Sequence, residues 1–180
     1  MQGNDKGLLK AHGKMLIEYT LDKLRPQVDY IFISANRNLD DYKNFNYPVY
    51  TDTRSDYAGP LAGILTALEN IHEEALLFVA PCDMPELPAN LLNRLVDHLL
   101  SQEAEICCVN TQNRLQPLLA VMHTGVHANL RTYLESGNKK VQDWVKQLAL
   151  TTVDYSDQET AFMNINTPDE LEQYERQDNE

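Results

Sequence analysis

Five polar side chains stand where they could do chemistry: Lys6, Asp52, Asp83, Asn164 and Asn166. Asp83 follows an apolar run and lies between two prolines in PCDMP, and proline stiffens a turn by fixing φ. A carboxylate at the end of a parallel strand can hold Mg²⁺, which takes one or two protein carboxylates together with phosphate oxygens. A turn aspartate that bonds only its own backbone would give the same sequence. Asp83 is therefore a candidate metal ligand.

Asp52 also follows a short apolar run, in YTDTRSDYAGPLAG. Its carboxylate can hold a nucleotide base or ribose through hydrogen bonds, although an exposed ion pair with Arg54 would also explain it. Gly59 and Gly63 bracket the start of the next expected helix. A missing side chain there permits close approach of a ligand, although helix packing alone would also explain the glycines.

Lys6 lies in a turn between Asp5 and Gly7. A lysine in a glycine-containing loop can act as a point charge on phosphates, although many lysines near a terminus are only solvated. Asn164 and Asn166 alternate along an extended segment, so their side chains face the same way. Paired amides can read the edge of a heterocycle, and turn chemistry or helix capping is the alternative interpretation.

Other kinds of site find no support in the sequence. Nothing resembles a Ser/His/Asp or Cys/His nucleophile system, and the five histidines are scattered. The three cysteines have no zinc-binding spacing, so Cys107 and Cys108 are interpreted as reduced, buried thiols. No stretch approaches the roughly 18 apolar residues of a membrane span, and the polar first ten residues do not resemble a signal peptide. We therefore expect a soluble cytoplasmic protein.

The charge balance limits the kinds of partner. The chain has 180 residues with 27 acidic and 15 basic side chains, a net charge of −12. This excess argues against non-specific binding to nucleic acid or to an anionic membrane, because both need basic patches. A small anionic ligand remains compatible, since one or two local cations and backbone N–H groups suffice to hold it.

Helical and strand-like apolar patterns alternate along the chain, which predicts βαβ units. We expect an α/β, Rossmann-like fold with a mostly parallel sheet and helices on both faces, and ligands at the carboxyl ends of the strands. Strands are predicted at 28–36, 47–52, 75–83, 104–110, 117–123 and 150–156. Helices are predicted at 14–24, 40–45, 59–74, 88–102, 126–137, 140–148 and 166–175.

The last predicted helix carries a start signal. Thr167 is expected at the N-cap, Pro168 in the first turn, and Glu170 three residues after the cap, which is the spacing of a capping box. We expect residues 1–175 to form a single domain and the acidic residues 176–180 to fray.

The segments NDKGLL, SANRN, TDTRSDYAGPLAG, PCDMPELP and FMNINTPDEL, in this order, resemble the molybdenum cofactor guanylyltransferases. The resemblance covers essentially the whole chain. It implies a Rossmann-like nucleotidyltransferase that transfers GMP from MgGTP to the phosphate of molybdenum-molybdopterin, releasing pyrophosphate. GTP and molybdopterin would be the substrates, Mg²⁺ the cofactor, and molybdoenzyme-maturation proteins the further partners.

Roles for the candidate residues follow from the same resemblance. Lys6 would hold the GTP phosphates and Asp52 the guanosine. Asp83 would bind Mg²⁺ at the transferring phosphate and thereby act as the catalytic residue. Asn164 and Asn166 match the family segment that lies against the pterin. The acceptor phosphate is itself the nucleophile, which agrees with the absence of an evident general base.

Two departures from the family pattern matter. Ser34 stands where an asparagine usually contacts the nucleotide, with Asn36 close behind. Family members also begin with a buried strand, Leu-Ala-Gly-Gly and an arginine, which this sequence lacks ahead of its NDKGLL segment. Met1 is therefore interpreted as an internal methionine. Because the missing strand would be central, we expect the 180-residue chain as written to fold poorly or lack activity.

Two other functions stay open from the sequence. One is a related nucleotidyltransferase that uses CTP or a sugar phosphate. The other is a non-catalytic remnant or binding protein that has lost the phosphate-gripping strand.

Overall fold

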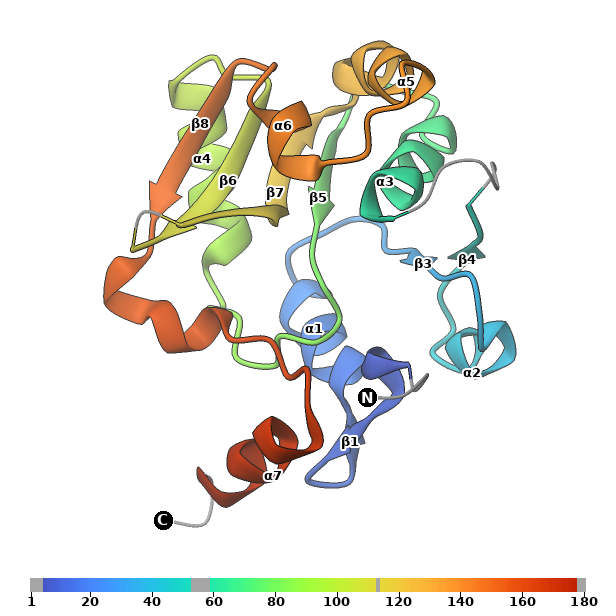
Figure 1. Ribbon diagram of the computed structural model, residues 1–180, viewed down its shortest axis with the longest axis vertical. Helices are drawn as coiled ribbons and strands as arrows, with labels where there is room; N and C mark the ends of the chain where they lie inside the picture. The colour runs from blue at the N-terminus through green and yellow to red at the C-terminus, as the bar shows by residue number, and fades with distance from the viewer. Residues whose placement is uncertain (1–4, 53–58, 113, 178–180) are drawn as a thin grey trace.

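A computed structural model describes residues 5–52, 59–112 and 114–177 (Figure 1). Its largest sheet has the strand order β5 (Leu76–Val79), β7 (Arg114–His123), β6 (Ile106–Thr111) and β8 (Leu150–Asp154). β7 is antiparallel to both neighbours, whereas β6 and β8 are parallel. The predicted α/β class is confirmed, but the sheet is mixed, and β5 pairs antiparallel with β7 instead of parallel as expected.

Two short sheets accompany this one. β3 (Ile33–Ser34) and β4 (Val49–Tyr50) form a parallel pair. β1 (Lys10–Ala11) and β2 (Lys14–Met15) form a hairpin whose turn residue Gly13 has φ 78°. The strand predicted at 28–36 is wrong in extent, because only its last part finds a partner strand among the described residues and a strand needs a ladder.

Helices cover both faces of the four-stranded sheet, as expected. The alternation along β6 shows why: Cys108 faces a cluster with Leu65 and Trp144, whereas Cys107 faces a second cluster with Leu95. These buried partners come from helices on opposite faces, so both faces of the strand are apolar. The helices are α1 (Leu16–Leu24), α2 (Leu39–Lys43), α3 (Pro60–Glu69), α4 (Leu91–Ser101), α5 (His127–Glu135), α6 (Val141–Val145) and α7 (Pro168–Gln177).

Most helices are shorter than the pattern predicts. α1 begins at Leu16 because Lys14 and Met15 belong to the hairpin, which the sequence analysis did not identify. α3 ends at Glu69, and the predicted extension to residue 74 is wrong. Three 3₁₀ turns, η1 (Lys6–Leu8), η2 (Thr124–Val126) and η3 (Ser156–Phe162), complete the described elements.

The cap predicted for α7 is confirmed. The Glu170 N–H donates to Thr167 Oγ1 at 3.1 Å, and the Thr167 N–H donates to Glu170 Oε2 at 2.9 Å. The helix continues to Gln177, through the first part of the expected tail, while 178–180 lie outside the described residues. Figure 1 shows α7 and the β1–β2 hairpin beyond the end of the sheet toward which β8 points. None of the helices in the described ranges is long and apolar enough to cross a membrane.

Candidate functional site

Four of the predicted site residues meet beyond the end of β5. The Lys6 ammonium lies 3.4 Å from Asp83 Oδ2 and also donates to Asn166 Oδ1. Asn164 Nδ2 donates to Asp83 Oδ1 at 3.1 Å. Residues separated by up to 160 positions thus form one hydrogen-bonded group, which we call the Asp83 cluster: Lys6, Asp83, Asn164 and Asn166.

The backbone fixes this arrangement. The Ile165 N–H donates to the Asp83 carbonyl at 2.9 Å, which pins the segment carrying both asparagines to the turn after β5. Ile165 itself is buried against the hairpin, so its neighbours Asn164 and Asn166 project to the opposite side. The Asn166 N–H also donates to Glu170 Oε2 at 2.6 Å, and the cap of α7 therefore helps to hold it.

The Asp83 cluster suits phosphate and metal chemistry. The side chain of Asp83 is only 9% exposed, whereas that of Lys6 is 42% exposed and open to a ligand. A buried carboxylate with one cation and one amide donor is compensated in the free protein. Its oxygens are the hard donors that Mg²⁺ prefers, and Mg²⁺ needs one or two carboxylates when phosphates supply the other ligands. Among the described residues, no group of three or more His, Cys, Asp or Glu forms a self-sufficient metal cage.

Asp52 lies in a second group, after β4. Asn36 Nδ2 donates to Asp52 Oδ2 at 2.7 Å, and the Asp52 N–H donates to Asn36 Oδ1 at 2.9 Å. The first bond orients the carboxylate through Oδ2, and the second ties the Asp52 backbone to the same asparagine. Arg54, which the sequence suggested as an ion-pair partner of Asp52, lies outside the described residues, as does the rest of the segment 53–58.

At Gly63 the missing side chain serves the packing of the helix, the second of the two interpretations of this glycine. A Cβ built there would lie 2.7 Å from Ser34 Oγ and 3.8 Å from Asp52 Oδ1. The missing side chain therefore lets α3 lie directly against the ends of β3 and β4. Gly59 precedes α3 with φ 99°, a conformation that favours glycine.

The residues that hold the Lys6 turn were not predicted from the sequence. Tyr42 OH donates to Asp5 Oδ1 at 2.6 Å, and Arg37 Nε lies 3.4 Å from Asp5 Oδ2. The nearness of Asp5 to Lys6 was the available signal, but its partners are more than thirty positions away. Spacing between neighbouring residues therefore could not predict the contacts of Asp5 with Tyr42 and Arg37.

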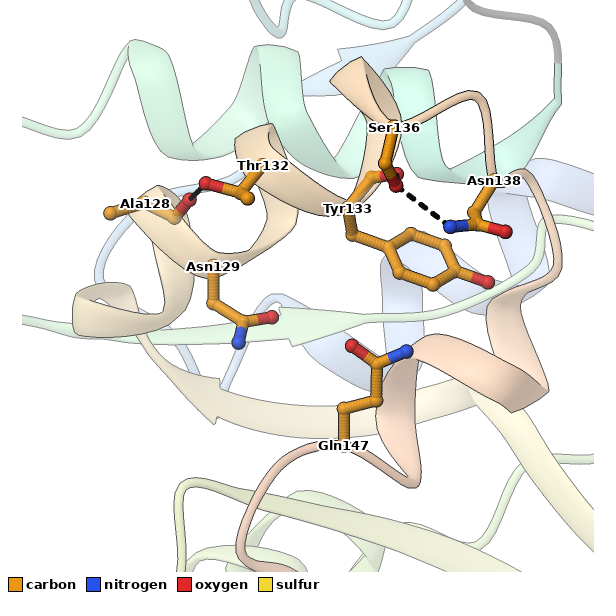
Figure 2. A pocket seen from close by; sticks show the side chains of 7 residues that line it. All are labelled: Ala128, Asn129, Thr132, Tyr133, Ser136, Asn138 and Gln147. Carbon is orange, nitrogen blue, oxygen red and sulfur yellow. Dashed lines mark hydrogen bonds between the residues drawn. The ribbon is translucent and has the colours of Figure 1, made fainter.

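A pocket of about 400 Å³ lies elsewhere, on α5 and the segment that follows it (Figure 2). Figure 2 shows the Asn129 and Gln147 amides and the Tyr133 ring around it, and Asn138 hydrogen-bonded to Ser136. None of its lining residues is charged. It lacks the cation that a polyphosphate needs, so the Asp83 cluster is the better candidate for phosphate chemistry.

The sequence matches the MobA-like NTP transferase domain family over residues 1–153. The chain belongs to this family. A molybdenum cofactor guanylyltransferase from Shewanella loihica is 38% identical over 173 residues, which cover 96% of this chain and 88% of the relative. The Shewanella frigidimarina enzyme of the same name is 39% identical with the same coverage. The resemblance inferred from the motifs is thereby confirmed.

Solved structures agree on the fold. Molybdopterin-guanine dinucleotide biosynthesis protein A from Archaeoglobus fulgidus superposes with a TM-score of 0.80 at 23% identity, covering 98% of this chain and 92% of that one. A Thermus thermophilus 2-C-methyl-D-erythritol 4-phosphate cytidylyltransferase gives 0.73 at 16% identity, covering 97% and 94%. The MobA-like family is a nucleotidyltransferase enzyme family, and this chain has its fold. The family match ends before Asn164 and Asn166, whereas the Shewanella matches span nearly the whole chain.

Proposed function

We propose that this protein transfers GMP from GTP to the phosphate of molybdenum-molybdopterin, forming the guanine dinucleotide cofactor and pyrophosphate. The observation that carries the proposal is the Asp83 cluster, in which a buried carboxylate meets an accessible lysine and two amides. The names of the Shewanella relatives support the guanylyl and molybdenum cofactor parts.

The chemistry asks for alignment and charge neutralisation more than for covalent help from the protein. Lys6 would hold the phosphates of GTP with its ammonium group. Asp83 would hold Mg²⁺, which when bound neutralises charge on the transferring phosphate. Asn164 fixes the Asp83 carboxylate from the other side, at 3.1 Å.

We assign the nucleoside to the second group. Asp52 Oδ1 would accept hydrogen bonds from guanosine, and Asn36 orients the carboxylate by donating to Oδ2. Asn164 and Asn166 would face the pterin substrate. The acceptor phosphate is the nucleophile, so Asp83 is needed for charge and alignment and not as a general base.

We further propose that residues 1–175 act as one domain and that the reaction takes place in the cytoplasm. The free thiols of Cys82, Cys107 and Cys108 agree with a reducing compartment. Proteins that mature molybdoenzymes would receive the product.

Nucleotide selectivity tests the assignment. Thermal stabilisation is measured with GTP and with CTP, each with Mg²⁺, because binding to the folded state raises the unfolding temperature. We expect a clear shift with GTP only. Equal or CTP-biased shifts would sink the guanylyl assignment and favour a cytidylyltransferase, the activity in the name of the Thermus thermophilus neighbour.

The same measurement addresses the start of the sequence. The 180-residue chain is compared with a version that carries an apolar strand, Leu-Ala-Gly-Gly and arginine ahead of Met1. Tighter GTP binding by the longer version would show that such a segment contributes to the nucleotide site. Pyrophosphate release in the presence of molybdopterin then separates an enzyme from a binding protein.

A further inference from the structure

The turn that carries Lys6 is held in place by contacts of the Asp5 side chain. This carboxylate accepts a hydrogen bond from Tyr42 OH at 2.6 Å and one from Asn38 Nδ2 at 3.3 Å. Arg37 Nε lies 3.4 Å from the same carboxylate. All three partners come from α2 or the segment that leads into it. Asp5 therefore ties the Lys6 turn to α2 and the segment that leads into it.

Gly7 brings the same tyrosine against the turn. A Cβ added at Gly7 would lie 2.8 Å from Tyr42 OH and 2.9 Å from Cys82 Sγ, closer than real contacts allow. Cys82 directly precedes Asp83. The Lys6 turn thus packs against both Tyr42 and the Asp83 turn, with no room for a side chain at Gly7.

Tyr42 is suited to be a permanent donor. Tyr42 is only 4% exposed. Burial is the main cause that raises the pKa of its hydroxyl, and the hydrogen bond to Asp5 is the second. The hydroxyl therefore stays protonated at physiological pH and remains the donor to the Asp5 carboxylate.

We propose that Tyr42 is a positioning residue for Lys6: by donating to Asp5 it fixes the turn so that the lysine reaches Asp83 and Asn166. This inference rests on the proposed function, in which Lys6 holds the GTP phosphates. Tyr42 touches neither substrate nor metal and acts only through the turn.

The Tyr42→Phe variant removes the hydroxyl and keeps the ring. Tyr133→Phe is the matched control, because Tyr133 is 6% exposed and donates to the Lys140 carbonyl at 3.0 Å, in the α5 region. We expect Tyr42→Phe to weaken MgGTP binding about tenfold or more, as for loss of one hydrogen bond to a charged group. The control should bind GTP as the wild type does.

Amide hydrogen exchange measures how well the Lys6 turn is ordered and needs no ligand. The Leu8 N–H donates to the Asp5 carbonyl at 3.2 Å, and the Leu9 N–H to that of Lys6 at 3.1 Å. We expect both amides to exchange faster in Tyr42→Phe and to be unchanged in Tyr133→Phe. If the wild type binds no GTP, the proposed function fails, and exchange still decides whether Tyr42 orders the turn.

A double-mutant cycle with Asp5→Asn tests the route through Asp5. Adding Tyr42→Phe to Asp5→Asn should cost little further affinity, because the charged acceptor is already gone. Fully additive losses, unchanged exchange at Leu8 and Leu9, or faster exchange with unchanged GTP affinity would each overturn the inference.

Discussion

The Lys6 ammonium lies 3.4 Å from Asp83 Oδ2 although 77 positions separate the two residues. The contact joins the turn before the β1–β2 hairpin to the turn after β5. Lysine is the exposed member of the pair and aspartate the buried one. In the proposed function, Lys6 is the member open to a phosphate, and Asp83 is the residue that would hold Mg²⁺.

Asp83→Asn should abolish metal-dependent activity while leaving the fold intact. The amide keeps the size of the carboxylate but loses the charge that holds Mg²⁺. We expect pyrophosphate release to fall by about a hundredfold or more, the order seen when a group that stabilises transition-state charge is lost. Asp97→Asn, on the exposed side of α4, is the control and should match the wild type. Retained activity in Asp83→Asn would remove the residue from the proposed site.

Lys6→Met should weaken GTP binding and flatten its salt dependence, because one attractive charge is removed from the phosphates. Lys6→Arg should recover part of the affinity, since the charge remains while the geometry changes. Titrations at two ionic strengths measure both effects. Lys140→Met, at a lysine whose side chain is 82% exposed, is the control. An equal affinity loss in Lys140→Met would indicate a general charge effect instead.

Asn36→Ala should reduce discrimination between GTP and other nucleotides. Without Asn36, the Asp52 carboxylate loses the amide donor on Oδ2, and the Asp52 N–H loses its acceptor. We expect GTP affinity to fall several-fold, which is about the effect of losing one hydrogen bond. The dependence of binding on Mg²⁺ should be retained. Calorimetry with GTP and ATP measures the ratio. Asn138→Ala, in the pocket of Figure 2, is the control, and an unchanged ratio in Asn36→Ala would count against the assignment of the nucleoside to this group.

Stability should fall between pH 9 and 12 because of the adjacent thiols of β6. Burial raises the pKa of Cys107 and of Cys108 to about 12, from an ordinary value of 9.0. Below pH 9 both thiols are neutral in the folded and in the unfolded protein, so their contribution to the stability of the folded state is fully present. Above it the unfolded chain ionises first, and unfolding becomes easier until the folded thiols also titrate.

Urea unfolding at pH 7.5, 9 and 10.5 measures this loss. A Cys107→Ala/Cys108→Ala variant should be less stable throughout but should show a shallower decline above pH 9. Parallel curves for the two proteins would show that other groups cause the decline.

Thr167→Ala should loosen the start of α7 by about 1 kcal/mol, the usual cost of a lost N-cap. Because the cap is local, faster exchange of the Glu170 amide should report it. Thr167→Ser should retain protection. Thr132→Ala, which loses a bond to the Ala128 carbonyl within α5, is the control and should leave this amide unchanged.

Local patterns predicted the parts of the fold that local chemistry determines. The cap at Thr167 and the approach at Gly63 were both evident from residue type, because each depends on a missing or short side chain. The antiparallel direction of β7 was not, since alternation fixes which residues face the core and not which way a neighbouring strand runs. The partnership of Tyr42 with Asp5 lay beyond reach for the same reason, as the fold alone brings them together.

The separation of the sheets has a consequence for the whole molecule. Among the described strands, β3 and β4 share no ladder with β5, yet Asp52 follows one sheet and Asp83 the other. The span between the two acidic groups is therefore set by side-chain packing, such as that of Phe32 against the main core, and not by backbone hydrogen bonds. A nucleotide that contacts both groups would connect the two sheets. The bound substrate would then stabilise the arrangement of the site that binds it.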